Sequence, residues 1–272
     1  MELVAAAKLR RAEARIEAMR PYAETMRELT AGVGRASSSV RMPLLEQRET
    51  VQSALVVPLT GDRGLAGAFN AQVLRRALAI ERQLVADGTR VSWLAVGKKG
   101  RSTLAFRKKA LVGEFVGFTD RPAYSDAQAI AHRAAELFVS REVDSVVLVY
   151  NRFVTALTQH VTEQALLPIS ADLFQTGEQE RADRAMRGDF IYEPEPEEIL
   201  ERLLPVYLET QVYRALLEST ASEQGARMTA MRNASKNAGE LIDRLTLQMN
   251  RARQAEITQE ILEVVAGAEA LV

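Results

Sequence analysis

The chain contains 272 residues, with 35 Lys and Arg against 36 Asp and Glu, so its formal charge is −1. This balance argues against a nucleic-acid-binding protein that relies on a basic face. The chain has no Cys, which excludes disulfides, thiolate metal sites and cysteine nucleophiles, and its two histidines are few for a histidine-based site. An apolar share of 47 % is sufficient for a core. No apolar run approaches the roughly 18 residues that suggest a membrane span.

The N-terminal part of the sequence has the period of a long helix. From Leu3 to about Leu45, glycine occurs only at Gly32 and Gly34. Apolar residues recur at steps of mostly three and four, while charged residues fill the other faces. These apolar positions are Ile16, Met19, Tyr22, Met26, Leu29 and Val33. Because proline removes a backbone donor, we expect a bend or local strain at Pro21.

The middle of the chain alternates between short apolar runs and amphipathic segments. The pattern predicts strands at Ser53–Thr60, Arg90–Val96, Leu111–Phe115, Ser145–Asn151 and His160–Leu167. It predicts helices at Gly67–Ala86, Lys98–Phe106 and Ser125–Ser140, the last with Ser125 as its N-cap. Such alternation is typical of a Rossmann-like α/β domain with a mostly parallel sheet, and the last two strands can form an antiparallel hairpin. Residues 171–195 read as an exposed connection.

The C-terminal part predicts a second, longer helix, from Glu195 to about Gly267. At ~1.5 Å per residue this helix would span on the order of 110 Å. A globular domain of this mass cannot enclose it, so the N-terminal helix or a partner protein must cover it. Small residues along it would let two helix axes approach closely; they are Ala221, Ser222, Gly225, Ala226, Ala230, Ala234, Ser235, Ala238 and Gly239. We therefore expect the terminal helices to form a long antiparallel coiled coil.

One loop resembles a phosphate cradle. In the sequence from Gly61 to Asn70, GDRGLAGAFN, a predicted strand leads through glycines 61, 64 and 67 into a helix. Backbone N–H groups and a helix N-terminus bind phosphate in this topology. The spacing differs from the dinucleotide fingerprint, and no Lys-Ser/Thr pair follows as in a P-loop. The loop is therefore interpreted either as a phosphate site or as a tight turn that Asp62 fixes, and the turn is the simpler interpretation.

The other chemically active residue types are few and scattered. The Gly97–Arg101 turn, GKKGR, could bind phosphate, but a solvated turn before a helix is the favoured interpretation. His132 falls on a predicted helix and His160 at the start of a strand, so both are interpreted as structural. The last helix carries a basic series that is either a solvated face or a contact surface for a partner with acidic loops. Its members are Arg227, Arg232, Lys236, Arg244, Arg251 and Arg253.

Taken together, several motifs resemble the gamma subunit of F-type ATP synthase. The most specific is the last helix, where ASEQGARMTAMRNASKNAGELI (221–242) precedes NRARQAEITQEILEVVAGAEAL (250–271). The start MELVAAAKLRRA (1–12), the loop GDRGLAGAFN (61–70) and the segment FIYEPEPEEIL (190–200) support it. The resemblance covers essentially the whole chain.

The resemblance implies a rotor subunit without catalytic residues, cofactor or metal. Residues 1–50 and 195–272 would form the coiled coil, and residues 51–194 the α/β foot. This central stalk would transmit rotation of the membrane c-ring, driven by proton or sodium flow, to a hexamer of alpha and beta subunits for ATP synthesis, or act in reverse. The implied partners are the alpha, beta and epsilon subunits and the c-ring, without nucleic acid. One copy would serve each complex, held peripherally at the cytoplasmic face of a bacterial plasma membrane.

The motif match also assigns contact residues. Arg227, Arg253, Gln254 and Thr258 correspond to shaft residues that contact loops of the alpha and beta head. Ile261, Leu262, Val264 and Val265 resemble the apolar tip that turns in a hydrophobic bearing. Phe190, Tyr192 and Glu193 resemble the part of the foot near the c-ring. An arginine suits such a contact because its guanidinium binds a carboxylate bidentately without changing charge state.

One departure and two other functions remain open at this point. Family members carry a further basic, helical segment before MELVAAAKLR, so we expect the chain as written to start inside that helix. The first alternative function is a nucleotide- or phosphate-binding α/β enzyme that uses the Gly61–Gly67 loop. The second alternative is a generic coiled-coil adaptor with a globular head. Where the long helix lacks a partner to cover its apolar residues, we expect the isolated chain to self-associate or aggregate.

Overall fold

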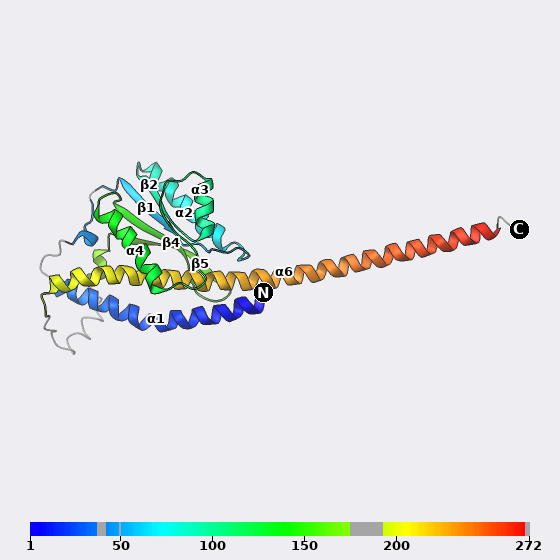
Figure 1. Ribbon diagram of the computed structural model, residues 1–272, viewed down its shortest axis with the longest axis horizontal. Coiled ribbons are helices and arrows are strands. Elements are labelled where there is room, and N and C mark those ends of the chain that lie inside the picture. Colours follow the sequence, from blue (N-terminus) through cyan, green and yellow to red (C-terminus); the bar gives the residue numbers. More distant parts are fainter. Residues whose placement is uncertain (37–41, 49, 175–192, 270–272) are drawn as a thin grey trace.

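A computed structural model describes residues 1–36, 42–48, 50–174 and 193–269 (Figure 1). Two long terminal helices lie beside one α/β domain, and the second of them projects far beyond it. The elements in chain order are α1 (Glu2–Ala36), η1 (Pro43–Leu45), β1 (Ser53–Pro58), α2 (Phe69–Ala86), β2 (Arg90–Val96), α3 (Lys98–Phe106), β3 (Leu111–Phe115), α4 (Tyr124–Val139), β4 (Ser145–Phe153), β5 (Gln159–Leu167), η2 (Ala171–Phe174) and α6 (Pro196–Glu269).

The sheet has five strands in the order β3-β2-β1-β4-β5. The pairs of β1 with β2, β1 with β4, and β2 with β3 are parallel, whereas β5 runs antiparallel to β4. All six residues of the central strand β1 are buried, as expected for a strand covered by helices on both faces. The mostly parallel sheet and its closing hairpin are thus confirmed.

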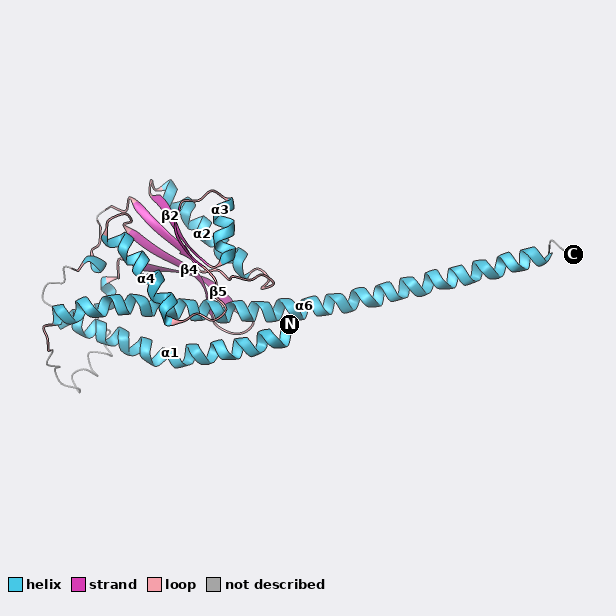
Figure 2. Cartoon of the chain, in the orientation of Figure 1, coloured by secondary structure: helices cyan, strands magenta, loops and turns pink. Residues whose placement is uncertain are grey.

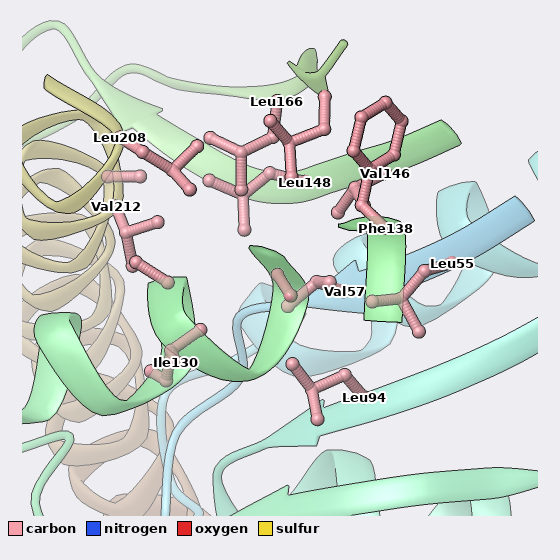
Figure 3. Packing of buried hydrophobic residues seen from close by; sticks show 14 of the residues in the cluster. Leu55, Val57, Leu94, Ile130, Phe138, Val146, Leu148, Leu166, Leu208 and Val212 are labelled. Atoms are coloured by element: carbon pink, nitrogen blue, oxygen red, sulfur yellow. The ribbon is translucent and has the colours of Figure 1, made fainter. Parts of the chain in front are cut away.

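Helices cover the two faces of the sheet (Figure 2). On one face, side chains of β1 and β4 meet α4 and the first part of α6, as Figure 3 shows for Leu148, Ile130 and Val212. On the other face, α2 and α3 pack on residues such as Val56 and Trp93. The first part of α6 is therefore a component of the central domain's core; its buried apolar residues there are Leu200, Leu204, Leu208, Val212, Ala215 and Leu216.

The two terminal helices are antiparallel. Glu2, at the start of α1, accepts a hydrogen bond from Arg232 Nε at 2.9 Å, and α1 ends beside the start of α6 (Figure 1). Between these points Leu9 and Ala12 pack against Ala221. The helix α1 continues through Pro21. None of the helices, within the described residues, has a stretch long and apolar enough to cross a membrane.

Two local expectations were wrong. The N-terminal helix α1 is described to Ala36 and does not continue through Leu45, because Pro43 begins a separate short turn, η1, and proline restricts the residue before it to extended backbone. The N-cap of α4 is Ala123 and not Ser125. There the Asp126 carboxylate accepts a hydrogen bond from the Ala123 N–H at 2.8 Å, which places the helix start two residues earlier.

A partly buried ion pair fixes the segment that leads from α1 into β1. Asp144, just before β4, accepts hydrogen bonds from the guanidinium of Arg48 and from the backbone N–H of Ser53 at 2.8 Å. Arg48 also donates to the Phe138 carbonyl at 2.7 Å and lies 4.9 Å over the Phe138 ring. Desolvation acts to raise the pKa of Asp144, but the bonds from Arg48, Ser53 and Gln52 outweigh it and lower the pKa to about 2.

We expect Asp144→Asn to lower the free energy of unfolding by about 1–3 kcal/mol at pH 7, since it leaves a guanidinium that is only 14 % exposed without its charge partner. A carboxyl whose folded pKa is depressed stabilises the fold above its ordinary pKa of 3.8 and ceases to do so as the pH falls towards 2. The difference between the two proteins should therefore shrink below about pH 4 in urea unfolding experiments. Asp87→Asn, on an exposed residue, is the control. A difference that persisted unchanged at pH 2 would contradict this account.

Candidate functional site

The carboxyl ends of the parallel strands form the edge at which Rossmann-like domains bind ligands. In this protein α6 occupies that edge. Its Thr220 hydroxyl donates to the Thr119 carbonyl at 3.0 Å, and its Ser222 hydroxyl donates to the Asn151 carbonyl at 2.9 Å. We call the segment Thr220–Arg227, together with the loops that it contacts, the joint. The crevice that could hold a nucleotide is filled by the protein's own helix.

The glycine loop is one wall of the joint. The Gly61 N–H donates to Asn70 Oδ1 at 2.8 Å, and the Asp62 N–H donates to Thr119 Oγ1 at 2.8 Å. The Asp62 carboxylate accepts hydrogen bonds from the N–H groups of Lys98 at 3.0 Å and Gly117 at 2.9 Å. Two of the loop's donors are thus used internally, and a carboxylate lies where an anion would approach. The interpretation as a turn that Asp62 fixes is favoured over a phosphate site.

The electrostatics of Asp62 agree with this structural role. Burial acts to raise the pKa of its carboxyl, but the hydrogen bonds from Gly117, Lys98 and Thr119 outweigh it, so the pKa lies below its ordinary value. The neighbouring GKKGR turn is used in the same way, since the Gly100 N–H donates to Thr60 Oγ1 at 2.8 Å. Neither turn keeps these donors available for a ligand.

A buried ion pair lies at the centre of the joint. Glu223 accepts a hydrogen bond from Arg227 Nη2 at 2.5 Å, and the same guanidinium donates to the Gly64 carbonyl at 3.3 Å. A Cβ at Gly61 would lie 2.7 Å from the Glu223 carboxyl group, so any larger residue there would force the Glu223 side chain to move. Burial raises the pKa of Glu223, Arg227 opposes this, and Asp120 and Asp62 add to it. The pair therefore connects the glycine loop to α6.

The helix α1 reaches the joint through one further bridge. Asp120 accepts hydrogen bonds from Lys8 Nζ at 2.5 Å and from Gln224 Nε2 at 2.9 Å. Burial acts to raise the pKa of Asp120, but Lys8, Arg63 and Arg227 outweigh it and lower the pKa. Asp120 thus links α1, the central domain and α6.

From Arg232 onward, α6 has no cover from the described part of the chain. Every residue from Arg232 to Gly267 is exposed, and the helix extends alone in Figure 1. We call residues 232–267 the bare shaft. Its large exposed apolar residues are Leu241, Ile242, Leu245, Leu247, Met249, Ile257, Ile261, Leu262, Val264 and Val265, with exposed fractions from 43 % to 72 %. Isolated apolar residues at a surface are ordinary, but a series of this length marks an interaction surface.

The predicted contact residues fall into three groups. Arg253, Gln254 and Thr258 lie on the bare shaft, as do the four predicted tip residues. Arg227 lies instead in the joint, where its side chain is 13 % exposed and paired with Glu223. Of the predicted foot residues, Glu193 is exposed, and Phe190 and Tyr192 lie outside the described residues. The contacts of all these residues with other subunits stay predictions.

One polar cluster was not predicted from the sequence. The carboxylate of Glu209, which is 4 % exposed, accepts hydrogen bonds from Tyr124 Oη at 2.6 Å and Gln128 Nε2 at 3.4 Å, and contacts His132 Nε2 at 2.8 Å. Desolvation, together with Glu209, raises the pKa of Tyr124. The helical spacing of the three partners on α4 could have indicated a shared acceptor, but nothing in the sequence identifies Glu209. The cluster attaches α4 to α6.

Known sequences match this chain over essentially its full length. A sequence family described as ATP synthase matches residues 1–271. The chain is 48 % identical over 271 residues to an ATP synthase gamma chain of Rubrobacter xylanophilus, covering 100 % of this chain and 91 % of the relative. It is 42 % identical to an ATP synthase gamma chain of Brevibacillus brevis, with 99 % and 91 % covered.

Solved structures share the fold. A chain in the central stalk and c-ring structure of the Tetrahymena thermophila mitochondrial ATP synthase is 31 % identical, with a TM-score of 0.63, and the match covers 86 % of this chain and 97 % of that one. A chain in a Euglena gracilis mitochondrial ATP synthase structure is 20 % identical, with a TM-score of 0.61 and coverage of 98 % and 95 %. The chain belongs to the family of ATP synthase gamma chains.

Proposed function

We propose that this protein is the central-stalk rotor subunit of an F-type ATP synthase. It would transmit rotation of a membrane c-ring to a hexamer of alpha and beta subunits and so drive ATP synthesis, or ion pumping in reverse. The observation that carries this proposal is the bare shaft, a continuous helix with a long apolar series that no described residue of the chain covers. Such a helix needs a surrounding partner, and a head that encloses it supplies one.

The shape of the molecule suits a rotor. The central domain lies on one side of α6, so the particle has no symmetry about the shaft axis (Figure 1). A ligand or subunit shifts a conformational equilibrium only by interacting differently with the states involved. An asymmetric shaft presents different surfaces to three otherwise equivalent catalytic subunits, and each would therefore be held in a different conformation.

The proposed partners follow from the two ends of the molecule. The bare shaft, with Arg253, Gln254 and Thr258, would contact alpha and beta, and Ile261, Leu262, Val264 and Val265 would turn in an apolar bearing. At the opposite end, Glu193 and the start of α6 would face the c-ring, and the epsilon subunit would bind the foot. The complex is membrane-associated, and we propose the cytoplasmic face of a bacterial plasma membrane as its place.

A nucleotide-binding enzyme is the weaker alternative. That function needs the carboxyl edge of the sheet for its ligand, and α6 fills this edge through Thr220, Ser222 and the Glu223–Arg227 pair. The glycine loop donors at Gly61 and Asp62 are also engaged internally. These observations support the rotor over the enzyme.

Co-expression with alpha and beta subunits tests the proposal. We expect a stable complex, and we expect Arg253→Ala with Gln254→Ala to lower its ATPase activity about ten-fold, or ~1.4 kcal/mol in the barrier. The control is Gln248→Ala, an exposed residue five positions before Arg253, which lies about 140° around the helix from Arg253 and about 120° from Gln254. Failure to form a complex, or an ATPase unchanged by the double substitution, would refute the assignment.

A further inference from the structure

Over about three turns, the helix α6 is buried on all of its faces. Every residue from Ala215 to Gly225 is buried, although an ordinary surface helix buries only one face. At about 100° per residue, the contact residues of the joint lie all around the helix axis. They meet the glycine loop, the loop containing Thr119 and Asp120, the end of β4 and, at Gly225, the β4–β5 hairpin, where a Cβ would lie 3.0 Å from the Ala156 carbonyl.

The two parts of α6 that the foot holds differ in the kind of contact they make. From Leu200 to Leu216 most contacts with the sheet and α4 are apolar, and the polar exceptions are the Glu209 cluster and the hydrogen bond from Gln164 to Gln211. Apolar contacts are non-directional, so they hold a helix in place without strongly fixing its rotation about its own axis. The joint supplies hydrogen bonds and a buried ion pair, which are directional. Of the directional contacts between α6 and the foot, those of the joint lie nearest to the bare shaft, so they set its rotation relative to the foot.

We propose that the joint is where torque passes between the central domain and the shaft, with Glu223 as the positioning residue that locks Arg227 against the glycine loop. This inference rests on the proposed rotor function. Glu223 is 3 % exposed and beyond the reach of any surrounding head, so it acts through the joint alone. Weakening the Glu223–Arg227 pair should make the connection between the foot and the shaft more compliant in torsion, without altering the catalytic subunits.

The test uses the assembled complex with the alpha and beta head fixed to a surface and a bead on the central domain. Charge-assisted hydrogen bonds are roughly twice as strong as neutral ones, so we expect Glu223→Gln to increase the angular variance of the stalled rotor about two-fold. In the intact synthase in vesicles, proton pumping per ATP hydrolysed should fall, while ATPase activity is kept. The control is Glu218→Gln, which also removes a buried carboxylate paired at i,i+4, with Arg214 at 3.0 Å. Among the described residues, Glu218 bonds to no loop of the central domain.

A disulfide that replaces the Glu223–Arg227 ion pair as the connection distinguishes an effect on torque transfer from a simple loss of folding. A Cβ at Gly67 would lie 3.8 Å from the Ala230 Cβ, a separation that suits a disulfide, and the chain contains no other Cys. With Gly67→Cys and Ala230→Cys, oxidation should return the variance of the Glu223→Gln rotor to its original value, and reduction should reverse this. If Glu223→Gln does not fold, the same disulfide in the otherwise unchanged chain should narrow the variance on oxidation.

The outcomes distinguish this inference from the function on which it rests. An unaltered chain that fails to assemble or rotate with alpha and beta overturns the rotor function. A chain that rotates normally, but whose variance and pumping respond neither to Glu223→Gln nor to the disulfide, overturns only the role of the joint.

Discussion

Gly97→Ala is expected to lower the free energy of unfolding by more than about 4 kcal/mol, a loss that few single substitutions cause. Gly97 follows β2 at a φ of +87°, and a Cβ there would lie 2.0 Å from the Thr60 carbonyl oxygen. That oxygen belongs to the backbone just after β1, whose position is fixed by the Thr60 N–H bond to Val96. The obstacle cannot rotate away as a side chain would, so the two neighbouring strands would have to separate.

Gly88→Ala provides the matched control. Gly88 has a φ of +82° but no atom within 4 Å of the position of a Cβ, so alanine there meets only the strain of a left-handed backbone. That strain is about 1–2 kcal/mol. Urea unfolding of the full-length chain can be followed by the fluorescence of its single Trp, Trp93, which is completely buried. Equal losses for the two variants would show that backbone strain, and not the contact with Thr60, governs Gly97.

The central domain was predictable because its signals are local. The bounds predicted for β2, α3 and β3 agree with the structure, since each run is delimited by a glycine or a charged turn. The start of α4 was wrong, because a serine near a helix start is a common cap, and the competing carboxylate of Asp126 was not considered. Sequence period also identified α6 and its need for cover.

The joint could not be predicted from periodicity. Buried residues at Thr220, Ser222, Glu223 and Gln224 are polar, and in a sequence they resemble the solvated face of a helix. Thr220, Ser222 and Gln224 bond to groups of the central domain that lie between 71 and 104 residues away in the chain, and no local pattern records such distances. For the same reason Arg227 was grouped with Arg253, although the structure places the first inside the molecule and the second on the bare shaft.

The glycine loop shows how one motif can serve two purposes. Three glycines between a strand and a helix allow a close approach of backbone to a ligand, and the sequence alone leaves open what that ligand is. In this chain the group that approaches Gly61 is the Glu223 carboxyl of α6, and a Cβ at Gly67 would contact Ala230 of the same helix. The loop therefore packs against α6, which explains glycines at a spacing that matches no nucleotide fingerprint.

Phe138→Ala is expected to lower the free energy of unfolding by about 3–5 kcal/mol, because the substitution leaves a cavity in the core that joins α4 to the sheet. Phe138 is completely buried near Val146 of β4, as Figure 3 shows, and its ring also carries the Arg48 guanidinium. The loss should therefore combine the cavity with a weaker anchor for the segment before β1.

Phe106→Ala is the control for that experiment. Phe106 ends α3 with 87 % of its surface exposed, so its removal should change stability by no more than about 0.5 kcal/mol. Combining Phe138→Ala with Asp144→Asn then separates the two contributions. If the Arg48 anchor depends on the ring, the double variant should lose less than the sum of the two single losses, because residues that share a partner are not additive. Strict additivity would mean that the Phe138 ring does not help to hold Arg48, and that Phe138 acts only by filling the core.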